Sequence, residues 1–319
     1  MTVREGTEDR GAIADMAAKA GRVRIICLGL SALDQVWRVE RFFAGEGAKL
    51  RGFDYSTLGG GMAANAAVTG ARLGGSVAFW GRAGDDAAGR EMRAAMAAEG
   101  IDVANFKLFA DGRSSVSGII VDASGERQIV NFRGAFPAAA DWLPLDEVAH
   151  VSAVLADPRW VEGAVALFGR ARALGIPTVL DGDVADADVF ERLLPLTDHA
   201  IFSEPALAAF AGSADDAALG KLARFNCRVT AVTRGSEGVS WSEHGHVHRR
   251  AAYTVPVVDT TGAGDVFHGA YVFAIGAGLA VRDAMAFAAA AAALKCTHSG
   301  GRAGIPSIHD CLALMRTHQ

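Results

Sequence analysis

Residues 253–274 read Tyr253-Thr-Val-Pro-Val-Val-Asp259-Thr-Thr-Gly-Ala-Gly-Asp265-Val-Phe-His-Gly-Ala-Tyr-Val-Phe-Ala274. Apolar residues from Phe267 to Ala274 recur at the spacing of one helix face, so a loop is predicted to enter a helix after the glycines. The start of a helix offers unpaired backbone N–H groups and the positive end of the helix dipole. Because glycines let a phosphate approach the backbone closely, residues 262–264 predict an anion-binding site.

Asp265 falls in the first turn of this predicted helix, beside the anion site. A carboxylate there can accept the proton of a hydroxyl group that attacks a phosphoryl group, which is the side-chain chemistry that phosphoryl transfer requires. The alternative is that Asp265 only caps the helix, as aspartate often does. Spacing alone leaves both interpretations open.

Outward from this segment, short apolar runs alternate with longer helical patterns from Val23 onward. This alternation is typical of parallel βαβ units and predicts an α/β fold with a layered sheet. Residues 115–132 and 239–248 break the alternation, because each predicts two strands joined by a turn. A small β lid beside the α/β body, formed from about residues 34–56 and 114–133, accounts for these strands.

Composition excludes some classes of protein. The chain has 319 residues, 51% of them apolar, and a net charge of −5, so no broad basic surface favours nucleic acid as a partner. The longest apolar run, residues 284–294, is too short to span a membrane, and we expect no membrane association and a cytoplasmic location. Residues 1–21 are predicted to be a disordered leader and residues 22–319 to form one domain. The four cysteines form no CxxC pair, which gives no sign of a zinc site.

The segment Asp259-Thr-Thr-Gly-Ala-Gly-Asp265 resembles the C-terminal signature of the ribokinase-like (PfkB) carbohydrate kinases, and the resemblance extends from about Val23 to Pro306. It implies an ATP-dependent sugar kinase with a Rossmann-like αβα sandwich and a small β-sheet lid. Asp265 would be the catalytic base. The backbone of Gly262, Ala263 and Gly264 would hold the transferred phosphoryl group.

The same resemblance implies sugar contacts near the lid. Gly59-Gly-Gly-Met-Ala-Ala-Asn65 is similar to the N-terminal glycine motif of the family, although a plain tight turn is the alternative. Gly60 and Gly61 would form the hinge under the lid, and Asn65 would contact sugar hydroxyls. Asp34, otherwise an exposed loop carboxylate, would accept hydrogen bonds from two hydroxyls.

Nucleotide and ion sites are also implied by the resemblance. The ATP phosphates are expected at Thr233, Gly235 and Gly238, and adenine near Cys296 to Ser299. Many relatives carry an NxxE motif that organises Mg²⁺, but this chain has Ser203-Glu-Pro-Ala206, which leaves Glu204 as a substitute. Asp259 and Thr261, with residues 299–304, resemble the monovalent-cation site of some relatives and suggest K⁺.

Several short sequence segments, among them Leu155-Ala-Asp-Pro-Arg-Trp160, resemble segments of kinases that phosphorylate O1 of 6-deoxy-6-sulfofructose. A sulfonate is a permanent anion that favours guanidinium, ammonium and neutral donors. By this resemblance Arg159, Asn131 and Lys49 would contact the sulfonate; a surface ion pair is the alternative for Arg159. A generic ketohexose or ribose kinase and a phosphosugar kinase remain open.

Two other classes of protein are less compatible with the sequence. A dinucleotide-binding Rossmann protein requires GxGxxG after the first strand, where this chain reads Ser31-Ala-Leu-Asp34. A sensor that has lost activity would be expected to lack Asp265 or its glycines, and all are present. Lid strands with exposed edges favour pairing between subunits, so a homodimer through the lid is expected.

Overall fold

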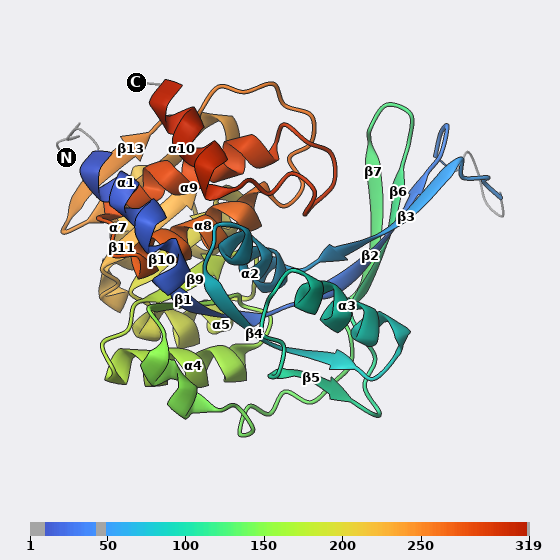
Figure 1. The fold of residues 1–319 in the computed structure, drawn as a ribbon, viewed down its shortest axis with the longest axis horizontal. Helices are drawn as coiled ribbons and strands as arrows, with labels where there is room; N and C mark the ends of the chain where they lie inside the picture. Colours follow the sequence, from blue (N-terminus) through green and yellow to red (C-terminus); the bar gives the residue numbers. More distant parts are fainter. Residues whose placement is uncertain (1–9, 43–48, 318–319) are drawn as a thin grey trace.

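The computed structural model describes residues 10–42 and 49–317. Its central sheet has the strand order β13-β12-β11-β10-β9-β8-β1-β4-β5 (Figure 1). These strands are β1 (Arg24–Gly29), β4 (Ser76–Gly84), β5 (Phe106–Phe109), β8 (Ala153–Ala156), β9 (Thr178–Gly182), β10 (His199–Ser203), β11 (Val229–Thr233), β12 (Val239–Glu243) and β13 (His246–Arg250).

From β5 to β11 every neighbouring pair is parallel, whereas β12 and β13 pair antiparallel. The hairpin turns at His244 and Gly245, whose φ angles of 50° and 78° match the turn that a two-residue hairpin loop favours. Strand order reverses around β1, which lies between β4 and β8. In open α/β sheets, ligands bind at the carboxyl ends of strands beside such a reversal.

Helices cover both faces of this sheet because its inner strands are apolar on both faces. In β1, Ile25 and Cys27 face one core, while Ile26 and Leu28 face the other. The first core is covered by α1 (Arg10–Lys19), α2 (Met62–Arg72), α3 (Ala87–Ala98), α8 (Ala263–Gly276), α9 (Val281–Lys295) and α10 (Ile308–Thr317). The second is covered by α4 (Val161–Ala173), α5 (Ala187–Leu193), α6 (Glu204–Ala211) and α7 (Asp216–Lys221).

Five short 3₁₀ helices are described at turns between these elements: η1 (Ala20–Arg22), η2 (Leu145–His150), η3 (Leu194–Leu196), η4 (Leu222–Phe225) and η5 (Gly235–Glu237). Within the described ranges, no helix is both long and apolar enough to cross a membrane.

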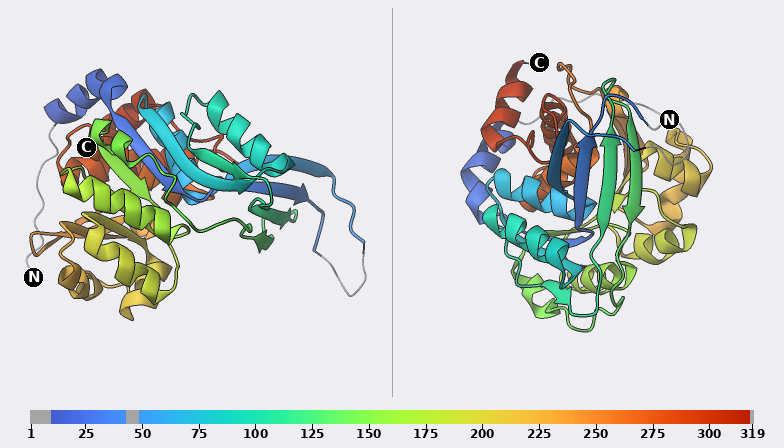
Figure 2. Two further views of the ribbon diagram at one scale, coloured as in Figure 1. Left: turned by 90° about the horizontal axis from the view of Figure 1, so that it is seen from below. Right: turned by 90° about the vertical axis from the view of Figure 1, so that its right-hand side faces the viewer.

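A second sheet extends away from the body, as Figures 1 and 2 show, and forms the lid. Its strand order is β3-β2-β6-β7. β2 pairs antiparallel with β3 and parallel with β6, and β7 pairs antiparallel with β6. The strands are β2 (Ala32–Arg38), β3 (Asp54–Gly60), β6 (Val116–Val121) and β7 (Arg127–Phe132). The predicted αβα sandwich with a small β-sheet lid is therefore confirmed.

The start of the described chain differs from the sequence prediction. Residues 10–22 form α1 and η1 instead of a disordered leader. Ile13 and Met16 are buried at 6% and 1% exposure, and α1 contacts α10 near the other end of the chain. Burial of these two side chains stabilises the helix, since short helices depend on packing of an apolar face. The prediction for residues 1–9 lies outside the described residues.

Candidate active site

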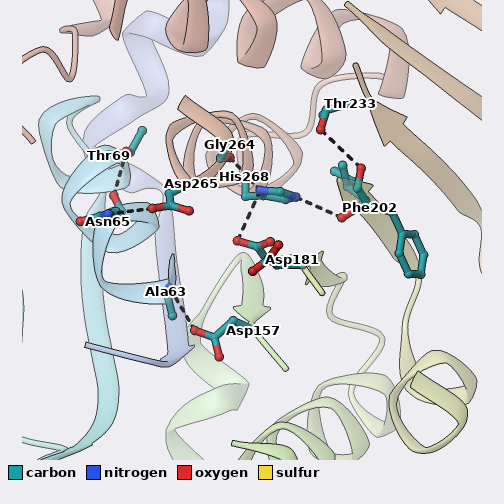
Figure 3. Close-up of polar contacts among 12 residues, drawn as sticks. Ala63, Asn65, Thr69, Asp157, Asp181, Phe202, Thr233, Gly264, Asp265 and His268 are labelled. Carbon is teal, nitrogen blue, oxygen red and sulfur yellow. Dashed lines mark hydrogen bonds and ion pairs between the residues drawn. The ribbon is translucent and has the colours of Figure 1, made fainter. Parts of the chain in front are cut away.

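Asp265 lies in the first turn of α8, and its carboxylate faces α2 (Figure 3). Gly262 precedes the helix with a φ of 76°, a left-handed conformation that glycine adopts without strain. Asn65, on the facing helix α2, donates from Nδ2 to Asp265 Oδ2 at 2.7 Å. Close packing of α2 on α8 requires Gly269, where an added Cβ would lie 2.5 Å from the Ala66 carbonyl oxygen. The two helices therefore fix the orientation of the carboxylate.

The pKa of Asp265 is raised to about 7. Burial is the main cause, because it disfavours the charged form, and the negative charge of Asp181 acts in the same direction. The hydrogen bond from Asn65 and the charge of His268 lower the pKa. A carboxylate with a pKa near neutrality suits a general base, which must accept a proton and later release it.

His268 lies beneath the base, one helical turn further along α8 (Figure 3). Its Nδ1 lies 2.7 Å from the Gly264 carbonyl oxygen and its Nε2 lies 3.1 Å from that of Ile201. Its Nδ1 also lies 3.4 Å from the Asp181 carboxylate. Burial, the largest effect, lowers the pKa of His268, although the two carbonyl contacts raise it, and burial raises the pKa of Asp181 well above its ordinary value. The buried contacts of His268 with Gly264, Ile201 and Asp181 therefore support the helix turn that carries Asp265.

The backbone amides at the start of α8 form the predicted anion site only in part. The Ala263 amide donates to the Thr260 carbonyl at 3.1 Å. In the described chain, the amides of Gly262 and Gly264 make no hydrogen bond, and the first amides of a helix have no partner within it. Two of the three predicted amides are thus free to bind an anion.

The predicted hinge glycines lie where β3 meets α2. A Cβ on Gly61, which has a φ of 96°, would lie 2.4 Å from the Leu30 carbonyl oxygen. A Cβ on Gly60 would lie 2.3 Å from Asp34 Oδ2. Burial raises the pKa of Asp34, while a hydrogen bond with Ser117 lowers it. The two glycines therefore leave room for Asp34 and for the chain entering α2.

Most of the predicted substrate residues line one cavity of about 770 Å³. Its lining includes the predicted residues Asp34, Gly60, Gly61, Asn65, Asn131, Arg159, Thr261, Gly262 and Asp265. Lys49 is exposed on the segment between β2 and β3 and is not part of the lining. Most of the predicted sugar contacts thus share one cavity with Asp265, and Lys49 is separate from it.

The predicted nucleotide residues lie outside this cavity. Thr233 ends β11, Gly235 and Gly238 flank the turn that follows, and Ser299 is exposed. The carbonyl oxygen of Cys296, the residue after α9, accepts from the amides of Val258 and Asp259, so this loop lies against the signature segment.

Metal ligands are sparse in the described chain, which contains no cluster of three or more acidic, histidine or cysteine side chains able to hold a metal ion. Glu204 is exposed at the first position of α6, where Ser203 caps the helix by accepting from the Ala206 amide at 3.4 Å.

Asp259 was predicted to bind K⁺, but its oxygens already accept hydrogen bonds. Oδ1 accepts from Arg127 of the lid at 2.7 Å and from the Thr261 amide at 2.9 Å. Oδ2 accepts from the Gly300 amide at 2.9 Å, and the carbonyl oxygen accepts from Lys295 Nζ at 2.8 Å. Arg127 also contacts the Thr261 hydroxyl. These residues do not fit the predicted K⁺ site.

Sequence reasoning missed several residues of the site. Arg82 and Arg133, which were not among the predicted site residues, both line the cavity. Arg302 donates from Nε to Asn65 Oδ1 at 2.8 Å and so holds the side chain that contacts the base. Asp157 is fully buried and accepts from the amides of Leu30 and Ala63 at 2.7 and 3.1 Å, which ties β1 to the start of α2. Arg82 lies within the mostly buried strand β4, and an arginine inside such a strand was the available signal.

Comparison with known proteins identifies the family of this chain. Residues 23–308 match the model of the pfkB family of carbohydrate kinases. Ribokinase from Haemophilus influenzae is 29% identical over 304 residues, covering 92% of this chain and 99% of that protein. Fructokinase from Klebsiella pneumoniae is 37% identical over 232 residues, covering 65% and 74%.

Solved structures agree as well. Arabidopsis thaliana ribokinase, complexed with ribose and ATP, has a TM-score of 0.82 at 25% identity, covering 92% of this chain and 98% of that one. A structure from Agrobacterium tumefaciens has a TM-score of 0.86 at 37% identity with the same two coverages. The chain therefore belongs to the pfkB family of carbohydrate kinases and is an ATP-dependent sugar kinase.

Proposed function

We propose that the substrate is a ketohexose with an anionic group, specifically 6-deoxy-6-sulfofructose, which the enzyme phosphorylates at O1. The observation that carries this proposal is a group of arginines, Arg82, Arg133 and Arg159, in the cavity that also holds Asp265. A neutral sugar offers no charge to such a group. A sulfonate offers three acceptor oxygens and a permanent negative charge.

Arg82 supports an anionic ligand most strongly. Its side chain is 9% exposed, and its guanidinium lies 4.3 Å from the Trp160 ring centroid and 5.0 Å from that of Phe136. Nη1 donates to the Pro137 carbonyl at 2.8 Å, but within residues 10–42 and 49–317 no carboxylate lies within ion-pair distance of it. Burial lowers the pKa of Arg82 to about 10, while the more distant charges of Glu162 and Asp157 raise it, so Arg82 still carries its charge at neutral pH. A buried charge without a directly paired carboxylate is costly, and an anionic substrate would reduce that cost.

Arg159 is already partly neutralised. It forms an ion pair with Asp183 at 2.9 Å and donates to the Val184 carbonyl at 2.8 Å. Asn131 donates to the Ser117 hydroxyl at 3.1 Å on the lid. Both residues line the cavity and would orient the sulfonate, with Arg82 as the main counter-charge.

For the chemical step, the Asp265 carboxylate takes the proton of the sugar hydroxyl as the oxygen attacks the γ-phosphorus of ATP. The new oxygen–phosphorus bond forms as the bond to ADP breaks. Asn65 orients the base, and the amides of Gly262 and Gly264, with the dipole of α8, stabilise the charge on the transferred group. Mg²⁺ bound to the nucleotide would neutralise phosphate charge, and Glu204 is the candidate to hold its water shell.

The nucleotide is proposed to lie along Thr233, Gly235 and Gly238, with adenine near Cys296 and Ser299. The carboxyl end of β11 supports this placement, because α/β proteins bind ligands at that edge of the sheet. Substitution of Gly235 by valine should weaken ATP binding and leave sugar binding unchanged.

A homodimer through the lid is also proposed. β3 and β7 are the outer strands of the lid sheet, and Tyr55 and Val130 on them are exposed at 52% and 79%. Exposed apolar side chains on an unpaired strand favour pairing with a second copy. Light scattering of Val130→Lys should then give a monomer where wild type gives a dimer.

The substrate is tested by coupled ADP release with sulfofructose, fructose, fructose 6-phosphate, tagatose 6-phosphate, ribose and adenosine. Wild type is compared with Arg82→Met, Arg159→Ala and the control Arg170→Ala, whose exposed partner is Asp146. Preference for sulfofructose, with both cavity variants far weaker on it than on fructose, supports the proposal. Preference for fructose or ribose with mild effects leaves a generic sugar kinase, and preference for a sugar phosphate leaves a phosphosugar kinase.

A further inference from the structure

Lys295 is a fully enclosed lysine next to the signature segment. It is the last residue of α9, its exposure is 0%, and Nζ donates to the Asp259 carbonyl oxygen at 2.8 Å. Lysine is almost never fully buried unless it is paired. The buried ammonium of Lys295 is therefore expected to have a specific role in holding residues 259–265.

The contact that Lys295 makes is one that a small bound cation could also make. Its hydrogen-bond partner is a backbone carbonyl of the loop that precedes α8, and a carbonyl is also a typical ligand of a monovalent ion. Burial is the largest effect on the pKa of Lys295 and lowers it from its ordinary value. The nearby negative charge of Asp259 opposes this effect, and Asp265 acts in the same direction as Asp259, while Arg127 lowers the pKa further.

The side-chain oxygens of Asp259 already have partners in the protein, one of which is positively charged. The Arg127 guanidinium and the Thr261 amide bind Oδ1, and the Gly300 amide binds Oδ2. With the carbonyl oxygen bound by Lys295, every oxygen of Asp259 accepts at least one hydrogen bond from the protein. To bind the Asp259 carbonyl oxygen in place of Lys295, a K⁺ ion would have to displace the Lys295 ammonium.

We propose that Lys295 is a tethered cation, which holds the signature loop in place of a monovalent ion, so that the enzyme does not require K⁺. Lys295 is a positioning residue. It fixes the Asp259 carbonyl, and through residues 260–262 it sets where the free amides of Gly262 and Gly264 point. Since a misplacement of about 1 Å can cost about a hundredfold in rate, the effect on turnover should be large.

The experiment measures turnover and melting temperature at constant ionic strength in choline, Na⁺, K⁺ and NH₄⁺ salts. Wild type should have equal turnover in all four. Lys295→Ala removes the ammonium and leaves space, so its turnover should fall about tenfold or more in choline and recover partly in K⁺ or NH₄⁺. The same ions should raise its melting temperature relative to choline.

Lys221→Ala is the matched control, because that lysine also donates to a backbone carbonyl, that of Ala211 at 2.9 Å, but is exposed. It should behave as wild type. The proposal is overturned if K⁺ activates wild type several-fold over Na⁺, a result that needs no variant. It is also overturned if folded Lys295→Ala loses turnover without a response to K⁺ or NH₄⁺.

The inference rests on the sugar-kinase activity and not on the identity of the sugar. The assay therefore uses whichever sugar in the panel gives the highest turnover. If sulfofructose is not a substrate, the substrate proposal fails while ion dependence can still be measured. The melting temperatures of wild type and Lys295→Ala in the four salts measure the effect of each ion without requiring turnover.

Discussion

Asn65 and Asp265 are 200 residues apart in the chain, and the Asn65 side chain donates a 2.7 Å hydrogen bond to the Asp265 carboxylate. Asn65 is itself held by Arg302, which donates to its Oδ1 at 2.8 Å. With its oxygen accepting from Arg302, the Asn65 amide can only present its nitrogen to the base. The base is therefore oriented by a chain of contacts from the loop after α9, through α2, to α8.

Activity should rise with pH as Asp265 loses its proton. With the pKa of Asp265 raised to about 7, kcat/KM should be low below that value, where the base is protonated, and level off above it. A profile of kcat/KM between pH 5 and 9 checks this. A midpoint near pH 4, the ordinary range of an aspartate, would contradict it.

Asn65→Ala should move that midpoint to higher pH. The hydrogen bond from Asn65 lowers the pKa of Asp265, and its loss should raise the pKa by about one unit. The loss of activity in Asn65→Ala relative to wild type should therefore be greatest at low pH. Asn105, which is half-buried and far from Asp265 in the sequence, has its amide 3.4 Å from Glu147 and supplies the control Asn105→Ala. An unchanged midpoint in Asn65→Ala would show that the contact does not tune the base.

His268→Gln and Asp181→Asn should shift the profile in opposite directions. The charge of His268 lowers the pKa of Asp265 and that of Asp181 raises it, so the first change raises the midpoint and the second lowers it. A merely structural role for the pair predicts loss of stability without these opposite shifts. Midpoints that move together, or not at all, would exclude an electrostatic role.

Gly61→Ala should destabilise the protein by about 1–3 kcal/mol, because the backbone has a φ of 96° and the new Cβ meets the Leu30 carbonyl oxygen. Urea unfolding gives the free energy. The matched change Gly220→Ala, on α7 with no atom within 4 Å of the added Cβ, should be neutral or stabilising. Equal stability of the two variants would mean that α2 adjusts to a side chain at position 61.

The sequence was sufficient to predict those elements whose sequence pattern lies within one continuous segment. The loop into α8, the glycines and Asp265 occupy one continuous segment, and the β12–β13 hairpin was predicted from its own turn at His244 and Gly245. The lid strands were predicted because residues 115–132 alternate as strands without an intervening helix.

The features that the sequence could not predict depend on tertiary contacts between residues far apart in the chain. Lys295 ends an alanine-rich helix and has no local sign of a partner, yet it meets Asp259 across 36 residues. Arg127 reaches the same Asp259 from the lid. In the same way, residues 1–21 were predicted to be a disordered leader because the burial of α1 depends on α10, which lies near the other end of the chain.

The most direct test of the catalytic assignment is Mg·ATP-dependent sugar phosphorylation by wild type and Asp265→Asn, with ATP affinity measured on both by calorimetry. Removing a general base should lower kcat by about 10²- to 10⁴-fold. Because the carboxamide keeps the shape of the side chain, ATP binding should stay unchanged. Near-normal turnover in Asp265→Asn, or loss of ATP binding, would contradict the role of Asp265 as the base.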